Sequence, residues 1–315
     1  MLPAYQSGHY GLRMYRQTLN PKYKELIWID MARVASTLNY LGQMDSEKKI
    51  IERRDYLLKR YFDKITPESS KRTKLRQNMF KMYPNYIFAA TLLGSMIRAD
   101  EYGLKSIYDS NLRNMIKILN FSEYVKSKMV VEAYAAQIAN QVFYLAQLGE
   151  DNNIDVFINT FRETYPDDKD SSLSKQQFEN KIYGMTHIIF AASRHYQLSI
   201  NQEDYLWIYK YMEKNIDTIL EKAKPDVVAE VGITFLLSNQ PNHKVVKKTQ
   251  QFINDKIDKM NSMILSEKGS NDIEIGEHRN VLAIMLLDWK GVHVGPNIQN
   301  NHSLFSNIPF GLVIK

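Results

Sequence analysis

The sequence predicts an all-α protein, an (α/α)6 toroid built from six helical hairpins. Three observations lead to this prediction. Apolar residues recur at helical spacing along most of the 315 residues, and no stretch shows the sustained alternation of a strand. Small, apolar stretches that open with a polar residue recur about every 45–55 residues, the length of one helical hairpin. Charged, amphipathic stretches alternate with them, as outer helices would alternate with buried inner ones.

The clearest recurrence joins two heptapeptides. Residues 85–91 read Asn-Tyr-Ile-Phe-Ala-Ala-Thr, and residues 187–193 read His-Ile-Ile-Phe-Ala-Ala-Ser. Stretches of the same character begin at Asp30, Gln137, Glu230 and His278. We expect six inner and six outer helices to close into a toroid, and an open superhelical stack of hairpins is the alternative. Closure rests on fold-level analogy, because six hairpins commonly complete such a ring.

The first half of the chain contains six predicted helices, over residues 8–19, 24–41, 47–65, 84–100, 104–119 and 121–148. Pro21 ends the first helix, because proline disfavours helical backbone in the residue before it. Gly42 and Gly149 end two others. Ser46 is a predicted N-cap, and residues 66–73 are a predicted polar loop.

The second half continues with helices over 155–164, 203–221 and 244–265, and with three apolar helices that contain His187, Glu230 and His278. Ser174-Lys-Gln-Gln177 is a capping box, in which the serine and glutamine side chains can bond two backbone N–H groups. It leads to the helix of His187, and His187 is placed at the polar start of its apolar stretch. We treat residues 1–315 as a single domain, with residues 291–315 as a loop-like tail.

Composition excludes several functional classes. The chain has no cysteine, so disulfides, thiolate metal sites and cysteine nucleophiles are excluded. No glycine-rich phosphate loop or Gly-x-Ser-x-Gly motif is present. The net charge is +6, but basic residues are interspersed with acidic ones and no nucleic-acid motif accompanies them, so a nucleic-acid partner is not expected.

No apolar run is long enough to span a bilayer, and the start of the chain does not read as a signal peptide. We therefore expect a soluble protein without a transmembrane segment. It would be periplasmic or secreted if a signal has been removed, and cytoplasmic otherwise.

In a closed toroid the inner helices are parallel, so their N-termini converge on one face. That face would gather Asn85, His187, Glu230, Glu277, His278 and Arg279, with Asp30, Arg33, Gln137 and Asn140 as less central neighbours. Converging helix dipoles give such a face a positive bias suited to anionic groups. A pocket with this composition is also where shifted pKa values and acid–base chemistry are expected.

Two chemical hypotheses use the carboxylates of this face. In one, His187, Glu230 and His278 bind a divalent metal such as zinc, which accepts imidazole and carboxylate ligands. In the other, Glu230 and Glu277 act as general acid and base on a glycosidic bond. No cofactor is required by the sequence, and a divalent metal stays open.

A third hypothesis is lyase chemistry on a sugar acid. A histidine with Tyr183 would abstract a proton, while Arg279 and Asn85 hold the substrate carboxylate. His9 and Tyr10 would join as substrate-binding residues if the N-terminal segment folds over the mouth of the ring. The competing interpretation is structural: these side chains cap helix ends or pair in the core.

Three segments carry a resemblance to a known family: residues 9–18, residues 183–193 and Glu277-His-Arg-Asn280. Through them the chain resembles an uncharacterised bacterial family, domain of unknown function 3541, over most of its length. The resemblance implies no established activity, but it marks the segments of Tyr183, His187 and Glu277–Asn280 as distinctive positions of the family.

The function that we predict is a carbohydrate-active hydrolase or lyase with a central polar pocket at the inner-helix N-termini, acting on a small molecule or glycan. This prediction rests on analogy with other helical toroids. The alternative is a non-catalytic ligand-binding or protein-interaction module.

Overall fold

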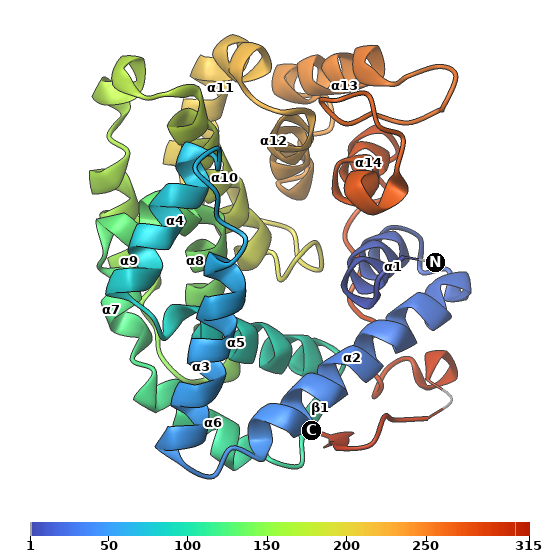
Figure 1. Cartoon of the computed structure of the whole chain (residues 1–315). Coiled ribbons are helices and arrows are strands. Elements are labelled where there is room, and N and C mark those ends of the chain that lie inside the picture. The colour runs from blue at the N-terminus through green and yellow to red at the C-terminus, as the bar shows by residue number, and fades with distance from the viewer. Residues whose placement is uncertain (1, 306) are drawn as a thin grey trace. The chain divides into compact units, whose positions relative to one another are not determined.

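The computed structural model describes residues 2–305 and 307–315 of the chain, and it is mostly helical (Figure 1). The described part contains fourteen α-helices, four short 3-10 helices and two strands of three residues each. The predicted all-α class is thus confirmed apart from one small sheet. Among the described residues, no helix combines the length and the apolar character that crossing a bilayer requires.

Residue contacts divide the chain into two compact units. The first unit contains residues 2–33 and 181–305, and the second contains residues 34–180 and 307–315. Two helices, α2 (Lys24–Gly42) and α10 (Lys175–Ala192), contribute residues to both units. The expectation of one domain over 1–315 stays a prediction.

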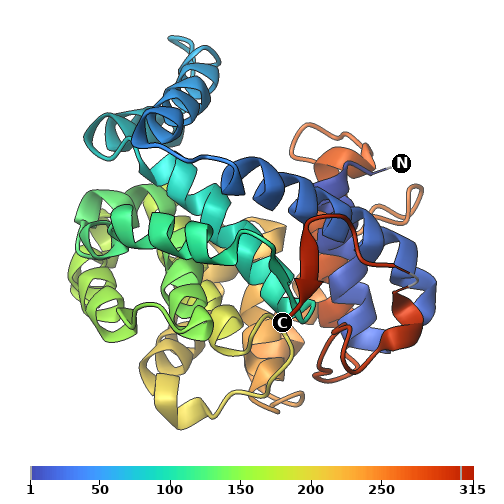
Figure 2. The ribbon, with the colours of Figure 1, turned by 90° about the horizontal axis from the view of Figure 1, so that it is seen from below.

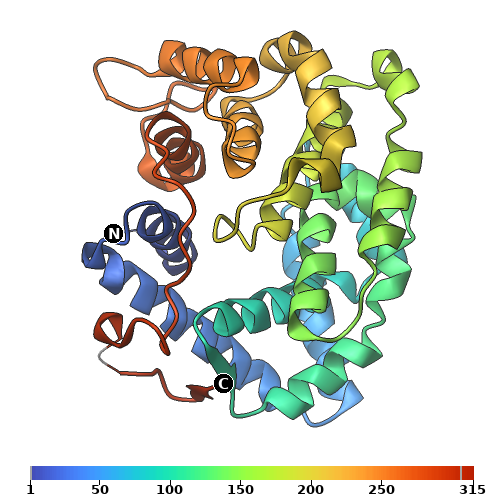
Figure 3. The ribbon, with the colours of Figure 1, turned by 180° about the vertical axis from the view of Figure 1, so that it is seen from behind.

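The first unit is built around α12 (Pro225–Leu237), in which every residue from Val227 onward is buried. An apolar surface on all sides requires neighbours on all sides. These neighbours are α11 (Leu206–Lys222), α13 (Lys244–Lys256) and α14 (Ile273–Leu287). On its other side, α14 packs against α1 (Ala4–Thr18), as Figures 1 and 3 show.

Three 3-10 helices complete the first unit: η1 (Pro21–Tyr23), η3 (Gln202–Tyr205) and η4 (His302–Leu304). Close packing in this unit depends on glycine. A Cβ on Gly232 would lie 2.4 Å from both Leu286 of α14 and Thr249 of α13. Any larger residue would force the Leu286 and Thr249 side chains to shift.

The second unit has α8 (Lys128–Leu148) at its centre, in contact with α4 (Lys71–Met82), α5 (Tyr86–Glu101) and α9 (Ile154–Thr164). The other elements are α3 (Glu47–Phe62), α6 (Asp109–Ile118), α7 (Phe121–Val125) and η2 (Asp167–Ser172). Strand β1 (Leu104–Ser106) pairs antiparallel with β2 (Leu312–Ile314) (Figure 2), so the C-terminal tail is not entirely loop.

Four expectations about the second unit were wrong. The described residues do contain a sheet, whose strands are too short to show alternation. Helix α4 occupies part of the predicted loop, because the Ser70 side chain accepts a hydrogen bond from the Thr73 N–H and starts a helix there. The helix predicted over 121–148 is broken before α8, whose N-cap is Ser127. The helix predicted over 104–119 begins instead as β1.

Candidate functional site

Five predicted site residues come together in the first unit: His9 of α1, His187 of α10, Glu230 of α12, and Glu277 and His278 of α14. We call them the histidine–glutamate cluster. His9 is held in place by a close approach of two helices: a Cβ on the preceding Gly8 would lie 2.2 Å from Asp30 Cγ on α2. Glycine is therefore needed for α1 to lie so near α2.

Four of the five residues form a linear series of contacts. Glu277 Oε1 lies 2.7 Å from His9 Nδ1, and His9 Nε2 lies 3.2 Å from His278 Nδ1. His278 Nε2 lies 3.7 Å from Glu230 Oε1. The fifth residue, His187, approaches the same oxygen of Glu230 with its Nε2 at 3.5 Å. Both Nε2 contacts are at ion-pair rather than hydrogen-bond distance.

The two carboxyl groups have pKa values shifted in opposite directions. Burial raises the pKa of Glu277 from 4.5 to about 7, and the positive charge of Arg13 only partly opposes this. Burial also acts to raise the pKa of Glu230, but His187, His278 and a hydrogen bond from Thr186 together outweigh it and lower the pKa. Thr186 Oγ1 donates to Glu230 Oε2 at 2.6 Å. Glu230 is therefore ionised at neutral pH, whereas Glu277 is near its midpoint.

The protonation state of His278 follows from its surroundings. Although 40% of its side chain is exposed, the surrounding protein desolvates the ring and lowers its pKa. Glu230 opposes this effect, and Arg13 adds to it. A lowered pKa leaves His278 neutral at neutral pH.

One assignment of hydrogens satisfies the whole series with neutral rings. The protonated carboxyl of Glu277 donates to His9 Nδ1, His9 Nε2–H donates to His278 Nδ1, and His278 Nε2–H faces the ionised Glu230. We assign these tautomers from the contacts, since each neutral imidazole carries one donor and one acceptor. The series can thus pass a proton from Glu277 toward His278.

The imidazoles, rather than the carboxylates, are accessible to a substrate. The side chains of Glu230 and Glu277 are 1% and 4% exposed, against 40% for His278 and 17% for His187. Two buried carboxylates cannot both flank a glycosidic bond without rearrangement. The arrangement instead resembles histidines that are oriented by a carboxylate behind them.

The expected position of the cluster at helix starts needs correction. Helix α10 begins at Lys175, so His187 is its thirteenth residue, well inside the helix. Glu230 and His278 each lie in the second turn of their helices. The first apolar residues of a stretch do not mark the helix start when an amphipathic segment precedes them in the same helix. The cluster is therefore formed by helix sides and not by converging N-termini.

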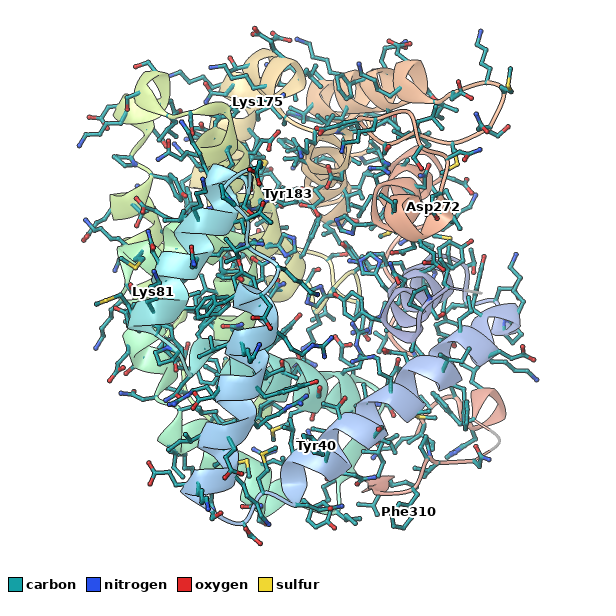
Figure 4. The ribbon with its side chains drawn as sticks, in the orientation of Figure 1. Tyr40, Lys81, Lys175, Tyr183, Asp272 and Phe310 are labelled. Carbon is teal, nitrogen blue, oxygen red and sulfur yellow. The ribbon has the colours of Figure 1, made fainter. Side chains whose placement is uncertain are left out.

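The other predicted residues of the first unit have partners of their own. Tyr183, which Figure 4 marks on α10, donates its hydroxyl to Asp226 Oδ2. Arg279 Nε donates to the carbonyl of Ile264 at 3.1 Å, so this guanidinium holds a loop. The ring of Tyr10 meets that of Tyr23 edge-on at 6.0 Å.

The less central neighbours are divided between the units. In the first unit, Arg33 donates to the buried Asp30 Oδ1 at 2.8 Å. Asn85 belongs to the second unit, where it precedes α5 and accepts a hydrogen bond from Arg54 at 3.2 Å. Gln137 and Asn140 lie on α8 of the same second unit.

Sequence reasoning missed three residues at the cluster: Arg13, Thr186 and Asp226. Arg13 lies one turn after His9, donates to its carbonyl at 3.3 Å and places its guanidinium 5.4 Å from the centre of the Tyr196 ring. The i, i+4 spacing from His9 was the available signal. Nothing in the sequence indicated the roles of the other two, because their partners lie about forty residues away.

A metal site is not apparent in the part of the chain that the structure describes. No group of three or more His, Asp or Glu side chains there has an arrangement that could hold a metal ion. His187 and His278 both approach Glu230, but each contact is that of an ion pair.

A cavity of about 490 Å³ adjoins the cluster within the first unit, and we call it the α14 cavity. One side of α14 and the segment 257–264 form most of its lining, which is mainly aliphatic. Two predicted site residues, Glu277 and Tyr10, also line it. Its volume lies within the range of small-molecule pockets.

Comparison with known proteins gives one match. No curated protein and no solved structure matches the chain. One family model, described as a domain of unknown function (DUF3541), matches residues 1–315, which confirms the resemblance seen in the sequence. The chain therefore belongs to the DUF3541 family.

Proposed function

We propose that this chain is an acid–base enzyme, a hydrolase or a lyase, in which histidines meet the substrate and buried glutamates set their protonation. One observation carries the proposal. Two carboxyl groups in a single series of contacts have pKa values moved apart, that of Glu277 to about 7 by burial and that of Glu230 downward by its histidine and threonine partners against its own burial. Such divergence is typical of acid and base groups in an active site.

In this proposal His187 is the general base and His278 the general acid. His187 takes a proton from water or from a substrate carbon, and the resulting imidazolium is stabilised by ionised Glu230. His278 gives its Nε2 proton to the departing oxygen. In the same step His9 donates its Nε2 proton to His278 Nδ1 and Glu277 donates its proton to His9 Nδ1, so both rings stay neutral, no imidazolate forms on His278, and Glu277 ends as a carboxylate.

Carbohydrate as the substrate class is carried over from the sequence by analogy. Exposed imidazoles in front of buried carboxylates favour proton transfer by histidine over a pair of glutamates flanking one glycosidic bond. The toroid of six hairpins stays a prediction, and the proposed chemistry does not require it, because the whole cluster lies in the first unit.

The test is a panel of neutral and uronate-containing polysaccharides. New reducing ends without absorbance identify hydrolysis, and an unsaturated, absorbing product identifies elimination. We expect His278→Ala and Glu230→Gln to lower kcat by about 10²–10⁴-fold, the usual contribution of a general acid–base group. His302→Ala, at an exposed histidine outside the cluster, is the matched control and should leave kcat unchanged.

Equal activity of the His278→Ala, His187→Ala and wild-type proteins would rule out the proposed roles. Absence of turnover on every substrate, together with saturable binding of one of them, would favour the alternative of a non-catalytic ligand-binding module. The mainly aliphatic α14 cavity is the observation that favours this alternative.

A second test uses pH. If Glu277 must be protonated to supply the acid, kcat of the wild type falls as pH rises through about 7. Glu277→Gln cannot supply that proton, so its kcat should be low at all pH values and lack this alkaline limb. If kcat of the wild type falls only far above pH 7, Glu277 is not the group that supplies the proton.

A further inference from the structure

The α14 cavity has one wall on the side of α14 that carries Glu277, Val281, Ile284 and Leu287. Met263 and Ile264, from the segment that precedes α14, also line it. Aliphatic side chains are left partly in water here: Ile273 is 50% exposed and Ile284 is 44% exposed. Covering them with an aliphatic group would be favourable, at about 25 cal/mol for each Å² removed from water.

Most polar groups of the lining already have partners. Asn280 accepts from the Ile264 N–H at 2.8 Å and donates to the carbonyls of Ile264 and Gly276, so it fixes the loop that contributes Ile264 to the lining. Asp288 is exposed and pairs with Lys290. Neither side chain is left to recognise a ligand inside the cavity.

Glu277 differs from these residues. It is 4% exposed, and its Oε1 is taken by His9. Among residues 2–305 and 307–315 this contact is the hydrogen bond that the Glu277 carboxyl makes, and Oε2 is not one of the fully buried side-chain atoms without a partner. The cavity lining therefore combines mainly aliphatic side chains with one carboxyl group whose second oxygen can accept a hydrogen bond.

We propose that the α14 cavity binds a small amphipathic molecule with an aliphatic body and an uncharged hydroxyl head group that donates a hydrogen bond to Glu277 Oε2. The charges around Glu277 select an uncharged head. Arg13 opposes a cationic head, and the carboxyl group itself opposes an anionic one. The two neighbouring side chains that could also bind a head group have partners already: His9 is bonded to Glu277, and the Tyr10 hydroxyl is bonded to Tyr23.

This inference goes beyond the proposed reaction and does not depend on it, because ligand binding needs no turnover. Burial of Glu277 supports it further: with a pKa raised to about 7, the carboxyl is mostly protonated in mildly acidic solution. Its proton is donated to His9 Nδ1, so Oε2 is left as an uncharged acceptor for a ligand hydroxyl. A sugar would not cover the aliphatic side chains of the lining with apolar surface, so it fits this cavity less well than an aliphatic molecule.

The test is a displacement assay at about pH 6, below the pKa of about 7 of Glu277. The probe is N-phenyl-1-naphthylamine, an uncharged dye that fluoresces in apolar sites. We expect saturable binding to the wild type and displacement by 1-decanol at lower concentration than by decylamine or decanoate. Stronger displacement by either charged compound would overturn the assignment of the head group.

A matched pair of variants places the site. Ile284→Glu puts a carboxylate on the lining and should weaken decanol binding at least tenfold, because an unpaired charge would have to be desolvated. Ile275→Glu alters an aliphatic residue of the same helix that is 64% exposed and lies outside the lining, and it should bind like the wild type. Both positions are exposed, so both variants should fold, which thermal melts can verify.

The contact with Glu277 has its own variant. Glu277→Ala should bind the dye but lose about fivefold in affinity for decanol, the effect of one hydrogen bond. No dye binding to the wild type, or equal decanol affinity in the wild type and Ile284→Glu, would overturn the site. Glycan turnover is not measured in this assay, so its outcome is separate from that of the proposed function.

Discussion

Helices α5 and α10 share nearly the same seven-residue stretch, but the polar residue that opens the stretch has different surroundings in each. The apolar positions behave alike: Phe88 of α5 and Phe190 of α10 are each 1% exposed. The first position differs. Asn85 stands at the start of α5 and accepts a hydrogen bond from Arg54, whereas His187 lies deep in α10 and faces Glu230. Matching apolar letters thus predict a shared core role, but not the role of the polar residue before them.

The buried polar groups of the two units differ in the same way. In the second unit, burial raises the pKa of Tyr86 and Tyr124 above their ordinary range and that of Tyr134 to about 12, and Arg76 lies 4.1 Å from the Tyr134 ring centre. None of these groups changes charge near neutral pH. In the first unit, the histidine–glutamate cluster contains groups that do. Acid–base chemistry is therefore expected of the first unit alone.

The largest expected effect tests whether the apolar positions shared by α5 and α10 have the same role in the core. Phe88→Ala and Phe190→Ala should each lower the free energy of unfolding by about 3–5 kcal/mol, because each removes a buried aromatic ring and leaves a cavity. Urea denaturation followed by circular dichroism measures this. Phe310→Ala, at a residue that is 88% exposed and is marked in Figure 4, is the control and should change it by less than about 0.5 kcal/mol. A large cost for only one of the two helices would contradict the equivalence of their apolar positions.

The next largest effect is the pH dependence of stability that Glu277 of the histidine–glutamate cluster contributes. The pKa of Glu277 rises from 4.5 to about 7 on folding, so the folded state holds this proton more tightly. Its contribution to stability is complete below about pH 4.5 and is lost as pH rises through about 7, up to about 3 kcal/mol. Glu277→Gln should therefore lose less stability than the wild type between about pH 5 and pH 8.

Tyr134→Phe is the control from the second unit. The pKa of Tyr134 is about 12, so this variant should keep the pH profile of the wild type over the same interval. Thermal midpoints at several pH values measure both. A wild-type midpoint that does not change between these pH values would show that Glu277 is ionised well below pH 7.

Sequence reasoning identified all five residues of the histidine–glutamate cluster, although they come from four helices. It succeeded because each is a polar residue in or beside an apolar stretch, which predicts a buried position that needs a partner. It failed for Thr186 and Asp226, since their partners are set by helix packing and not by spacing. It also grouped Asn85 with the cluster, because similarity of letters does not indicate to which unit a helix belongs.

The start of α10 also shows what an apolar sequence pattern fails to predict. The capping box at Ser174 is confirmed: Gln177 N–H donates to Ser174 Oγ at 3.3 Å, and Ser174 N–H donates to Gln177 Oε1 at 3.0 Å. This box starts α10 at Lys175, twelve residues before His187, where the apolar pattern alone had placed the beginning. A side chain that caps is thus a better indicator of a helix start than the first apolar residue.

The smallest expected effect follows from this difference between the starts of α10 and α5. Ser174→Ala removes the two hydrogen bonds of the Ser174 hydroxyl, one from the Gln177 N–H and one to Gln177 Oε1, and should cost about 1 kcal/mol of unfolding free energy. Asn85→Ala should cost less than about 0.5 kcal/mol, because Asn85 occupies the N-cap position of α5 without a capping hydrogen bond from its side chain. Denaturation midpoints of the two variants and the wild type measure the two costs. A larger cost for Asn85→Ala would mean that its hydrogen bond from Arg54, and not capping, determines what the polar residue before the shared apolar letters contributes to its helix.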